Sequence, residues 1–363
     1  MADSIRVLLG TTKGVFILTA APDRTTWRVE GPLCDGYPIN HVIGDPATGE
    51  IWAAGGGGWF PLGVWHRDPA GAWTFSGAGF AEDLAGLWSL ALGPDRLLAG
   101  TKPANLYESR DRGASWQHMP ALTDQDGAAE WMPGAAGLTL HTILTDAADP
   151  AKIWVGISAA GFFATEDGGA SWTARNRRSN ADTYQMPEFH DQPIDQTAVF
   201  SCVHNAVRAT GAGDLIYQQN HHGTYRSPDG GRNWTAISAG LPSHFGFSIA
   251  VHPHDPQTIW TFPLNGDSKG RFPPDASAAV WRSRDGGESW EACREGLPAQ
   301  DCFFTVLRQA MAVDNAASPG VYFGTNSGSV FASFDTGDTW HEIARHLPTI
   351  LSVETLRTAS AEG

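Results

Sequence analysis

Short apolar runs separated by turn residues recur along the whole chain. In residues 142–158 and 248–262, a first apolar run, a turn containing Asp-Pro and a second apolar run follow one another. A third run leads into a polar segment that ends in Trp. The alternation of apolar and polar positions, the β-branched and aromatic residues and the turn residues predict four short strands in each such unit.

The polar segment is itself a repeat. The pattern Ser/Thr-x-Asp-x-Gly-x-x-Trp occupies residues 109–116, 165–172, 227–234, 283–290 and 333–340, and two less regular copies end at Trp27 and Trp73. Successive terminal tryptophans lie 46, 43, 56, 62, 56 and 50 residues apart. Four strands recurring at this interval are typical of a propeller blade. We therefore predict an all-β fold in which residues 1–363 form a single seven-bladed β-propeller domain.

The two ends of the chain are expected to close the ring. The first unit has strands near residues 5–11, 15–19 and 27–30, but no strand before them. After the last repeat the chain still contains LPTILSVETLR, which has the pattern of an innermost strand. We predict that Leu351 to Leu356 completes blade 1, because closure removes the exposed sheet edges of an open all-β protein.

The repeated segments are expected to stabilise the fold. The Asp carboxylate can accept backbone N–H groups of its own turn, the Gly permits a positive φ, and the Trp can pack between blades. Because the same residues recur in every blade, we favour this structural role over a calcium or sugar site formed by the aspartates.

These repeats resemble the Asp-box, or BNR, repeats of sialidases and of propellers such as photosystem II assembly factors and sortilin-type receptors. More narrowly, TTKGVF, QQNHHGTYRSPDGG, FGFSIAVHPHDP and VYFGTNSGSVFASFD resemble bacterial BNR-repeat, WD40/YVTN/BNR-like proteins. The resemblance implies that the repeats lie at the turn between strands three and four, and that a ligand site lies on the opposite face.

The catalytic motifs of sialidases are missing from this chain. It has no Arg-Ile-Pro motif, and only Arg208, Arg308 and Arg357 fall in or beside innermost strands. Three guanidinium groups that converge on one carboxylate cannot be assembled from them. The resemblance therefore implies the fold, and classical sialidase activity is not expected.

Charge and cysteine content narrow the function classes. The formal net charge is −15, which disfavours nucleic acid or an anionic membrane as partner. Four cysteines without CxxC spacing are interpreted as small buried residues in a reducing compartment. With no signal-peptide pattern or long apolar run, the expected location is cytoplasmic. Gly55 to Gly58 opens no helix, so no nucleotide cofactor is expected.

Seven innermost strands align on their own pattern and predict a polar ring at the mouth of the central channel. Their first residues are His41, Ser89, His141, His204, Ser248, Gln309 and Ser352. The ends of the second strands point to the same mouth, where blade 5 adds Gln219, His221 and His222 and blade 1 adds Lys13. Histidines at one repeated position, beside a His-His pair, are the main candidates for function.

Three long insertions are expected on the same face. Residues 117–137 contain Glu130 and Trp131, and residues 173–201 contain Arg177, Tyr184 and Glu188. Residues 264–278 are rich in Pro and Gly. Insertions gathered on one face usually form lids or binding loops.

Two interpretations of the ring remain open. In the first, His41, His141 and His204, with His221 or His222, hold a divalent metal such as Zn, Fe or Cu, and Glu130 or Glu188 acts as general base. In the second, the ring is hydrated by ordered water.

The sequence favours a hydrolase or lyase acting on a polar, glycan-like small molecule. The residues expected to bind that molecule are Gln309, Gln219, Trp131, Arg177, Tyr184 and Lys13. The alternative is a non-enzymatic scaffold that binds a protein partner.

Overall fold

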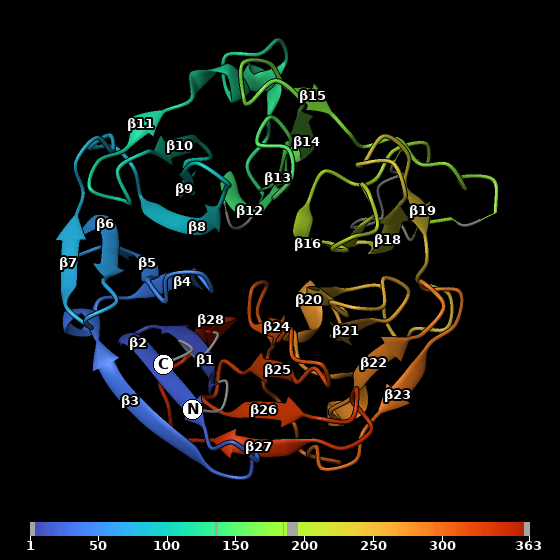
Figure 1. Ribbon diagram of the computed structural model, residues 1–363. Coiled ribbons are helices and arrows are strands. Elements are labelled where there is room, and N and C mark those ends of the chain that lie inside the picture. Colours follow the sequence, from blue (N-terminus) through green and yellow to red (C-terminus); the bar gives the residue numbers. More distant parts are fainter. Residues whose placement is uncertain (1–3, 135–136, 184, 187–194, 359–363) are drawn as a thin grey trace.

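Seven antiparallel sheets of four strands surround a central axis (Figure 1). The computed structural model describes residues 4–134, 137–183, 185–186 and 195–358. Within these residues, each sheet is one blade with its first strand at the axis and its last strand at the rim. The predicted seven-bladed propeller is confirmed.

The strands of the first four blades follow the chain, except that the last strand of the protein joins blade 1. Blade 1 contains β28 (Ile350–Thr358), β1 (Ser4–Thr11), β2 (Gly14–Ala20) and β3 (Trp27–Leu33). Blade 2 contains β4 (Ile39–Gly44), β5 (Ile51–Gly57), β6 (Phe60–Arg67) and β7 (Trp73–Ser76). Blade 3 contains β8 (Gly86–Leu92), β9 (Leu97–Lys102), β10 (Leu106–Ser109) and β11 (Gln117–His118). Blade 4 contains β12 (Thr139–Thr145), β13 (Ile153–Ser158), β14 (Gly161–Thr165) and β15 (Thr173–Ala174).

The last three blades have the same order, and short 3-10 helices lie in the connections. Blade 5 contains β16 (Val203–Arg208), β17 (Ile216–Asn220), β18 (Gly223–Ser227) and β19 (Thr235–Ala236). Blade 6 contains β20 (Gly246–Val251), β21 (Ile259–Pro263), β22 (Val280–Ser283) and β23 (Glu291–Cys293). Blade 7 contains β24 (Met311–Val313), β25 (Val321–Gly324), β26 (Val330–Ser333) and β27 (His341–Ala344). The helices are η1 (Cys34–Gly36), η2 (Pro120–Leu122), η3 (Ala128–Glu130), η4 (Asp267–Lys269) and η5 (Pro274–Ala276).

The two ends of the chain close the ring as expected. Strand β28 pairs antiparallel with β1, with Val353 opposite Leu9. The side chain of Leu356 is buried in an apolar cluster that also includes Leu8 from blade 1 and Ile39 from blade 2. The last strand therefore contributes both the innermost ladder of blade 1 and packing against the next blade.

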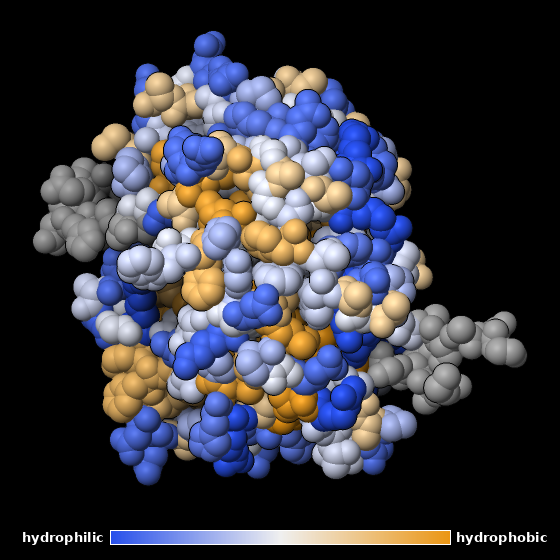
Figure 2. Space-filling view, turned by 90° about the vertical axis from the view of Figure 1, so that its left-hand side faces the viewer, coloured by the Kyte–Doolittle hydropathy of each residue, from blue (hydrophilic) through white to orange (hydrophobic). Residues whose placement is uncertain are grey.

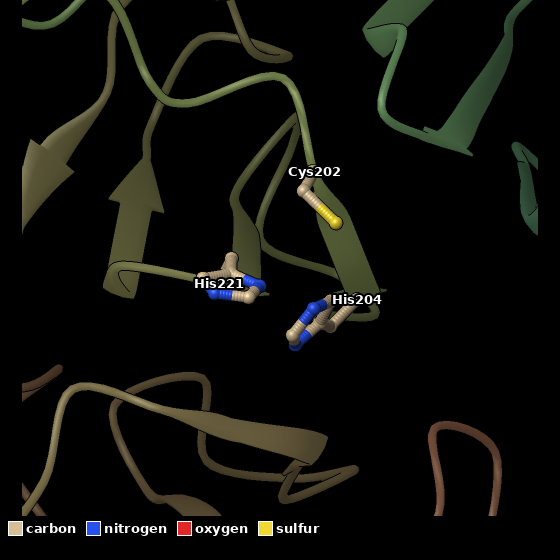
Figure 3. Close-up of side chains that lie close together, drawn as sticks. All are labelled: Cys202, His204 and His221. Carbon is tan, nitrogen blue, oxygen red and sulfur yellow. The ribbon is translucent and has the colours of Figure 1, made fainter. Parts of the chain in front are cut away.

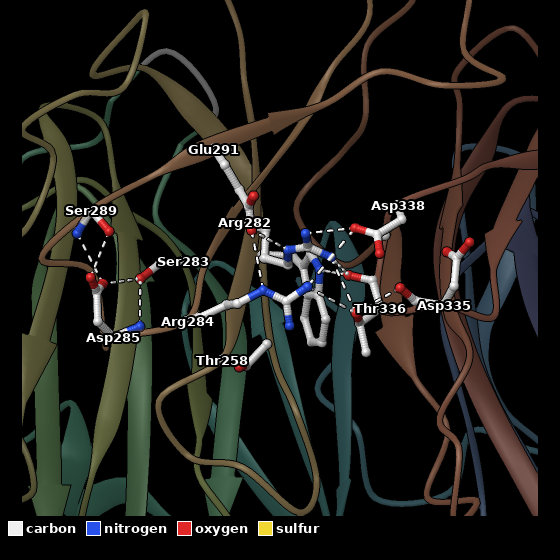
Figure 4. Close-up of polar contacts among 12 residues, drawn as sticks. Thr258, Arg282, Ser283, Arg284, Asp285, Ser289, Glu291, Asp335, Thr336 and Asp338 are labelled. Carbon is white, nitrogen blue, oxygen red and sulfur yellow. Dashed lines mark hydrogen bonds and ion pairs between the residues drawn. The ribbon is translucent and has the colours of Figure 1, made fainter.

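The five regular repeats form the same turn, between the third and fourth strands of their blades. In blade 6, the Ser283 hydroxyl donates to Asp285 Oδ1 at 2.7 Å, and Gly287 N–H donates to Ser283 Oγ at 2.8 Å. The second carboxylate oxygen of Asp285 accepts the Ser289 hydroxyl at 2.6 Å (Figure 4). The corresponding atoms of the other four repeats are bonded in the same way. The aspartates thus satisfy their own turns, as the sequence predicts.

Three of these turns also accept a hydrogen bond from an indole of the preceding blade. The indole N–H groups of Trp52, Trp154 and Trp260, on the second strands of blades 2, 4 and 6, donate to turn carbonyls of blades 3, 5 and 7 at 2.9, 3.0 and 3.0 Å. Between blades 6 and 7, the buried Arg282 guanidinium donates to the carbonyl of Thr336 and the carboxylates of Glu291 and Asp338 (Figure 4). The repeat turns therefore connect blades as well as strands.

The rim of the ring mixes hydrophilic residues with smaller apolar areas on the side shown in Figure 2. Among the described residues, no helix has the length and apolar character needed to cross a membrane.

Replacing Leu356 by Ala should destabilise the protein strongly, because it leaves a cavity where β28 packs between blades 1 and 2. We expect the free energy of unfolding to fall by about 2–5 kcal/mol. Val29 on the outer strand β3 is 45% exposed, so Val29→Ala should change the free energy of unfolding by less than about 0.5 kcal/mol. Urea denaturation of both variants measures the difference, and equal effects would contradict closure by β28.

The repeat aspartates should make stability depend on acid pH. Hydrogen bonds from Ser289 lower the pKa of Asp285 from its ordinary 3.8 to about 2. A depressed pKa in the folded state stabilises the protein above about pH 4, and this stabilisation is lost as pH falls through about 2. Asp285→Asn should therefore lower the melting temperature at neutral pH. The difference in melting temperature between this variant and the wild type should become smaller below pH 4. The control Glu288→Gln, at an exposed position of the same turn, should show no such narrowing in calorimetry.

Candidate functional site

The innermost strands of blades 2 to 5 each contain a bulge, and their register differs from that of the predicted polar ring. His41 and Ser89 lie opposite Ala54 and Gly100 of the second strands. In blades 4 and 5, the residues in this register are Thr142 and Asn205, opposite Gly156 and Gln219. His141 and His204 thus lie one residue earlier, at the position of Asn40 and Trp88. Aligning the three histidines at one position was wrong by one residue: His141 and His204 are the bulged residues of their strands, whereas His41 is the residue after the bulge.

His41 and His141 use both ring nitrogens within the protein. His41 Nδ1 accepts the backbone N–H of Leu90 at 2.9 Å, and its Nε2 lies 3.4 Å from Glu354 Oε1. His141 Nε2 donates to the Val203 carbonyl at 2.8 Å, and its Nδ1 lies 3.0 Å from Thr142 Oγ1. These contacts join neighbouring blades at the axis, and they do not bring the two histidines into a common group with His204.

Side chains from opposite sides of the ring bridge the axis. Gln309 Nε2 from blade 7 donates to the His141 carbonyl of blade 4, and Asn205 Nδ2 of blade 5 donates to the Arg308 carbonyl at 2.7 Å. At the mouth beside these bridges lie two cavities of about 320 and 120 Å³ that share Arg308 in their linings. The smaller one also contains His141 and Gln309.

The larger cavity, here called the axial cavity, draws its lining from blades 4 to 7 and from all three insertions. Its polar lining includes Cys202, His204, His221, Asp267, Arg271 and Arg308, and its apolar lining includes Phe245 and Phe247. It opens on the face where first strands begin and second strands end, opposite the repeat turns. A cavity is thus present at the mouth of the channel, and most of its lining comes from blades 5 and 6 and the loops beside them.

Cys202, His204 and His221 converge within this cavity. Cys202 precedes β16, His204 lies on β16, and His221 lies in the turn after β17. Figure 3 shows the three side chains pointing toward one another, and a ligand atom from each lies within 4.8 Å of the others. His204 Nδ1 is bonded to the Gly246 carbonyl at 2.6 Å, and His221 Nε2 lies 3.6 Å from Asp267 Oδ2. This is a set of donors typical of transition-metal sites.

The electrostatics of the cavity are set by two arginines. The guanidinium of Arg308 lies 4.7 Å from the centre of the Phe247 ring, and that of Arg271 lies 5.8 Å from it. Burial lowers the pKa of Arg308 to about 10, with the neighbouring Arg271 acting in the same direction and Cys202 opposing it. Burial, followed by the charge of Arg308, lowers the pKa of His204 well below 6.5 and that of His141 to about 3. Both imidazoles are therefore neutral.

The remaining predicted site residues that the structure describes lie outside the lining of the axial cavity. Gln219 is buried, and its amide bonds to Asn220, Gly223, Thr224 and Thr261.

Trp131 packs on Phe163, Glu130 is exposed on η3, and Lys13 is exposed in the β1–β2 turn. Arg177 donates to Asn233 in a repeat turn, and His222 packs edge-on against Phe200. Tyr184 and Glu188 lie outside the described residues.

Sequence reasoning missed Cys202, Phe247, Asp267 and Arg271. All four cysteines are free, and the interpretation as buried residues holds for Cys34, Cys293 and Cys302 but is wrong for Cys202, which is partly exposed. Burial raises the pKa of Cys293 to about 11 and also raises that of Cys34 and Cys302. The spacing Cys202-x-His204 was the available signal. Asp267 and Arg271 belong to the third insertion, whose position over blade 5 only the fold reveals.

Comparisons with known proteins agree with this fold. No protein-family model matches the chain. A xyloglucanase from Paenibacillus sp. is 27% identical over 257 residues, which cover 63% of this chain and 22% of the enzyme. The crystal structure of an ancestral GH74 enzyme matches with a TM-score of 0.60 and 16% identity, over 85% of this chain and 38% of that one. YCF48 bound to D1 peptide matches with a TM-score of 0.53 and 14% identity, over 84% and 83%.

This chain therefore spans about a fifth of the xyloglucanase and less than half of the GH74 enzyme. At these identities, the structural likenesses show the propeller fold alone.

Replacing His41 by Ala should affect stability and leave ligand binding in the axial cavity unchanged. The substitution removes the acceptor of the buried Leu90 N–H, so the free energy of unfolding should fall by about 1–3 kcal/mol. The control His118→Ala, at an exposed residue of the outer strand β11, should cost less than about 0.5 kcal/mol. Urea denaturation measures both, and an unchanged stability of the His41 variant would argue against its structural role.

Proposed function

We propose that this protein binds a small, polar, glycan-like molecule carrying a carboxylate or another anionic group in the axial cavity, and that it acts on this molecule as a hydrolase or lyase. One observation carries the proposal. The guanidinium of Arg308 lines both mouth cavities, and across the described residues its side chain has no hydrogen bond or ion pair.

An arginine in this position favours an anion from the solvent. Burying a guanidinium without a partner costs several kcal/mol, and the Phe247 ring face offsets about 0.5–2 kcal/mol of that cost. A carboxylate can accept two parallel N–H groups from one guanidinium, which restores the missing hydrogen bonds. A ligand with such a group should therefore bind more tightly than its neutral analogue.

Arg271 supports the same ligand class. It lines the cavity beside Arg308, and no ion pair or side-chain hydrogen bond is formed by it within the part of the chain that the structure describes. Its backbone has φ +58°, a left-handed conformation that costs a non-glycine residue roughly 1–2 kcal/mol. A strained arginine aimed at a cavity is more typical of a binding residue than of a packing one.

The reaction class rests on the shape and composition of the cavity and on its glycan-acting relative. The xyloglucanase relative and the GH74 enzyme suggest glycosidase-like chemistry. Ordinary glycoside hydrolysis needs two carboxylates flanking the scissile bond. Among the described lining residues, Asp267 is the one carboxylate, and it faces His221. The described lining therefore does not fit a two-carboxylate mechanism.

A protein partner is the second candidate. Four exposed apolar residues lie on the cavity face, in a second-strand turn or in loops before innermost strands: Trp59, Phe60, Met132 and Phe303. The side chain of Trp59 is 99% exposed at the tip of the β5–β6 hairpin. The structure of YCF48 bound to a peptide supports such a role for a propeller of this size.

The Arg308→Gln variant separates the two candidates. Removing one charged hydrogen-bond donor should weaken binding of small uronic-acid saccharides about 10- to 100-fold, while the binding of neutral saccharides stays unchanged. Isothermal calorimetry with paired acidic and neutral saccharides measures this. The control Arg345→Gln, at an exposed rim position, should bind like the wild type. Equal affinity for acidic and neutral saccharides, or no binding of either by the wild type, would reject the proposal in favour of a protein partner.

A further inference from the structure

We propose that Cys202, His204 and His221 form a site for one divalent transition metal ion, best suited to Zn²⁺, with its open coordination position facing the axial cavity. This goes beyond the proposed function, because it assigns a metal site whose existence does not depend on which molecule enters the cavity. The site uses two of the histidines singled out from the sequence, His204 and His221, and adds a thiolate ligand.

The donor set fits zinc. Thiolate and imidazole ligands favour Zn²⁺ over Mg²⁺ or Ca²⁺, which prefer oxygen. The three ligand atoms lie within 4.8 Å of one another. Ligand atoms around tetrahedral zinc lie roughly 3.3–3.7 Å apart, as follows from Zn–N and Zn–S bond lengths. Small side-chain rotations of His221 and Cys202, which are both partly exposed, close that difference.

The contacts around the imidazoles orient them for a metal. His204 Nδ1 must carry the proton, because it is bonded to the Gly246 carbonyl at 2.6 Å, and Nε2 therefore keeps its lone pair. His221 Nε2 faces Asp267 Oδ2 at 3.6 Å, which is the arrangement in which a carboxylate orients a metal-binding histidine through its other nitrogen. Metal-binding imidazoles almost always have such partners.

The surroundings hold the site in place and leave one side open. The His204 ring packs against Phe245 and Phe247 at centroid distances of 5.3 and 4.7 Å, and the His221 ring packs against Phe245 at 5.0 Å. All three ligand residues line the axial cavity, so the site is open on its cavity side. Three protein ligands with an open fourth position are typical of catalytic zinc sites.

The neighbouring arginine is compatible with this site. Arg308 and a divalent cation repel each other, but the thiolate of Cys202 and an anionic ligand bound between them supply opposite charge. The metal and the arginine would then bind the same anion from two sides. An anion should therefore bind more tightly to the metal-loaded protein than to the metal-free protein.

Metal titration of the full-length chain tests the site. Protein produced without a histidine tag and stripped with chelator should bind one equivalent of Zn²⁺. Co²⁺ should give the visible bands of a tetrahedral site and a thiolate-to-metal charge-transfer band in the near ultraviolet. Zn²⁺ should also raise the melting temperature, because it binds the folded state.

Four variants distinguish this site from adventitious binding. Cys202→Ser should abolish the charge-transfer band, and His221→Ala should remove stoichiometric binding. Asp267→Asn should weaken the affinity about 10- to 100-fold, because it removes the carboxylate that orients His221. The control His118→Ala should bind like the wild type. Circular dichroism of each metal-free variant checks folding, and if one ligand variant unfolds, the other still decides.

The proposal is overturned if the wild type binds no stoichiometric Zn²⁺, or if the Co²⁺ spectrum is octahedral and unchanged by Cys202→Ser. Its failure can be told apart from failure of the anion proposal. Arg308→Gln should retain metal binding while losing selectivity for acidic saccharides. Metal binding without acid selectivity in the wild type would reject the anion proposal alone.

Discussion

The hydrogen bonds between a repeat turn and the preceding blade are the interaction on which the rest of the ring depends. The Asp of each regular turn accepts hydrogen bonds within its own turn, and in three of the turns one carbonyl accepts a hydrogen bond from the blade before. In blades 3, 5 and 7 that carbonyl belongs to Arg112, Gly230 and Thr336, and an indole N–H from the blade before donates to it. All three residues have positive φ. The same turn residues therefore shape the turn and bind the neighbouring blade.

The repeat turns connect blades on one face of the ring, and the long insertions lie on the opposite face, around the mouth of the channel. There the insertions add length without disturbing the blades, and they bring Asp267 and Arg271 over blade 5. The axis itself is crossed by Gln309 and Asn205, so polar groups at the centre mostly satisfy one another. Arg308 and the group of Cys202, His204 and His221 line the axial cavity. The ligand and metal proposals follow from the residues that line this cavity.

Much of the fold could be predicted because its signals are local. The repeat needs an Asp that caps its own turn and a Gly with positive φ, and both are written in eight consecutive residues. The count of blades and closure by β28 follow from that period and from the strand missing before β1. The candidate site was predicted in part: His204 and His221 line the cavity, whereas His41 and His141 hold neighbouring blades together.

The sequence by itself determined the seven blades, since each blade is built from residues near one another in the chain, and it determined the closure, since the first unit lacks a strand that the last segment supplies. Tertiary structure alone decided which polar residues are available. His141 and His204 are the bulged residues of their innermost strands, whereas His41 follows the bulge of its own strand and contacts Glu354 of blade 1. Whether a polar side chain near the axis is satisfied depends on residues from other blades. His41 accepts the Leu90 N–H of the next blade, whereas the side chain of Arg308 has no hydrogen-bond partner among the described residues. Residues that meet between blades lie tens of residues apart in the sequence, so no local pattern predicts these contacts.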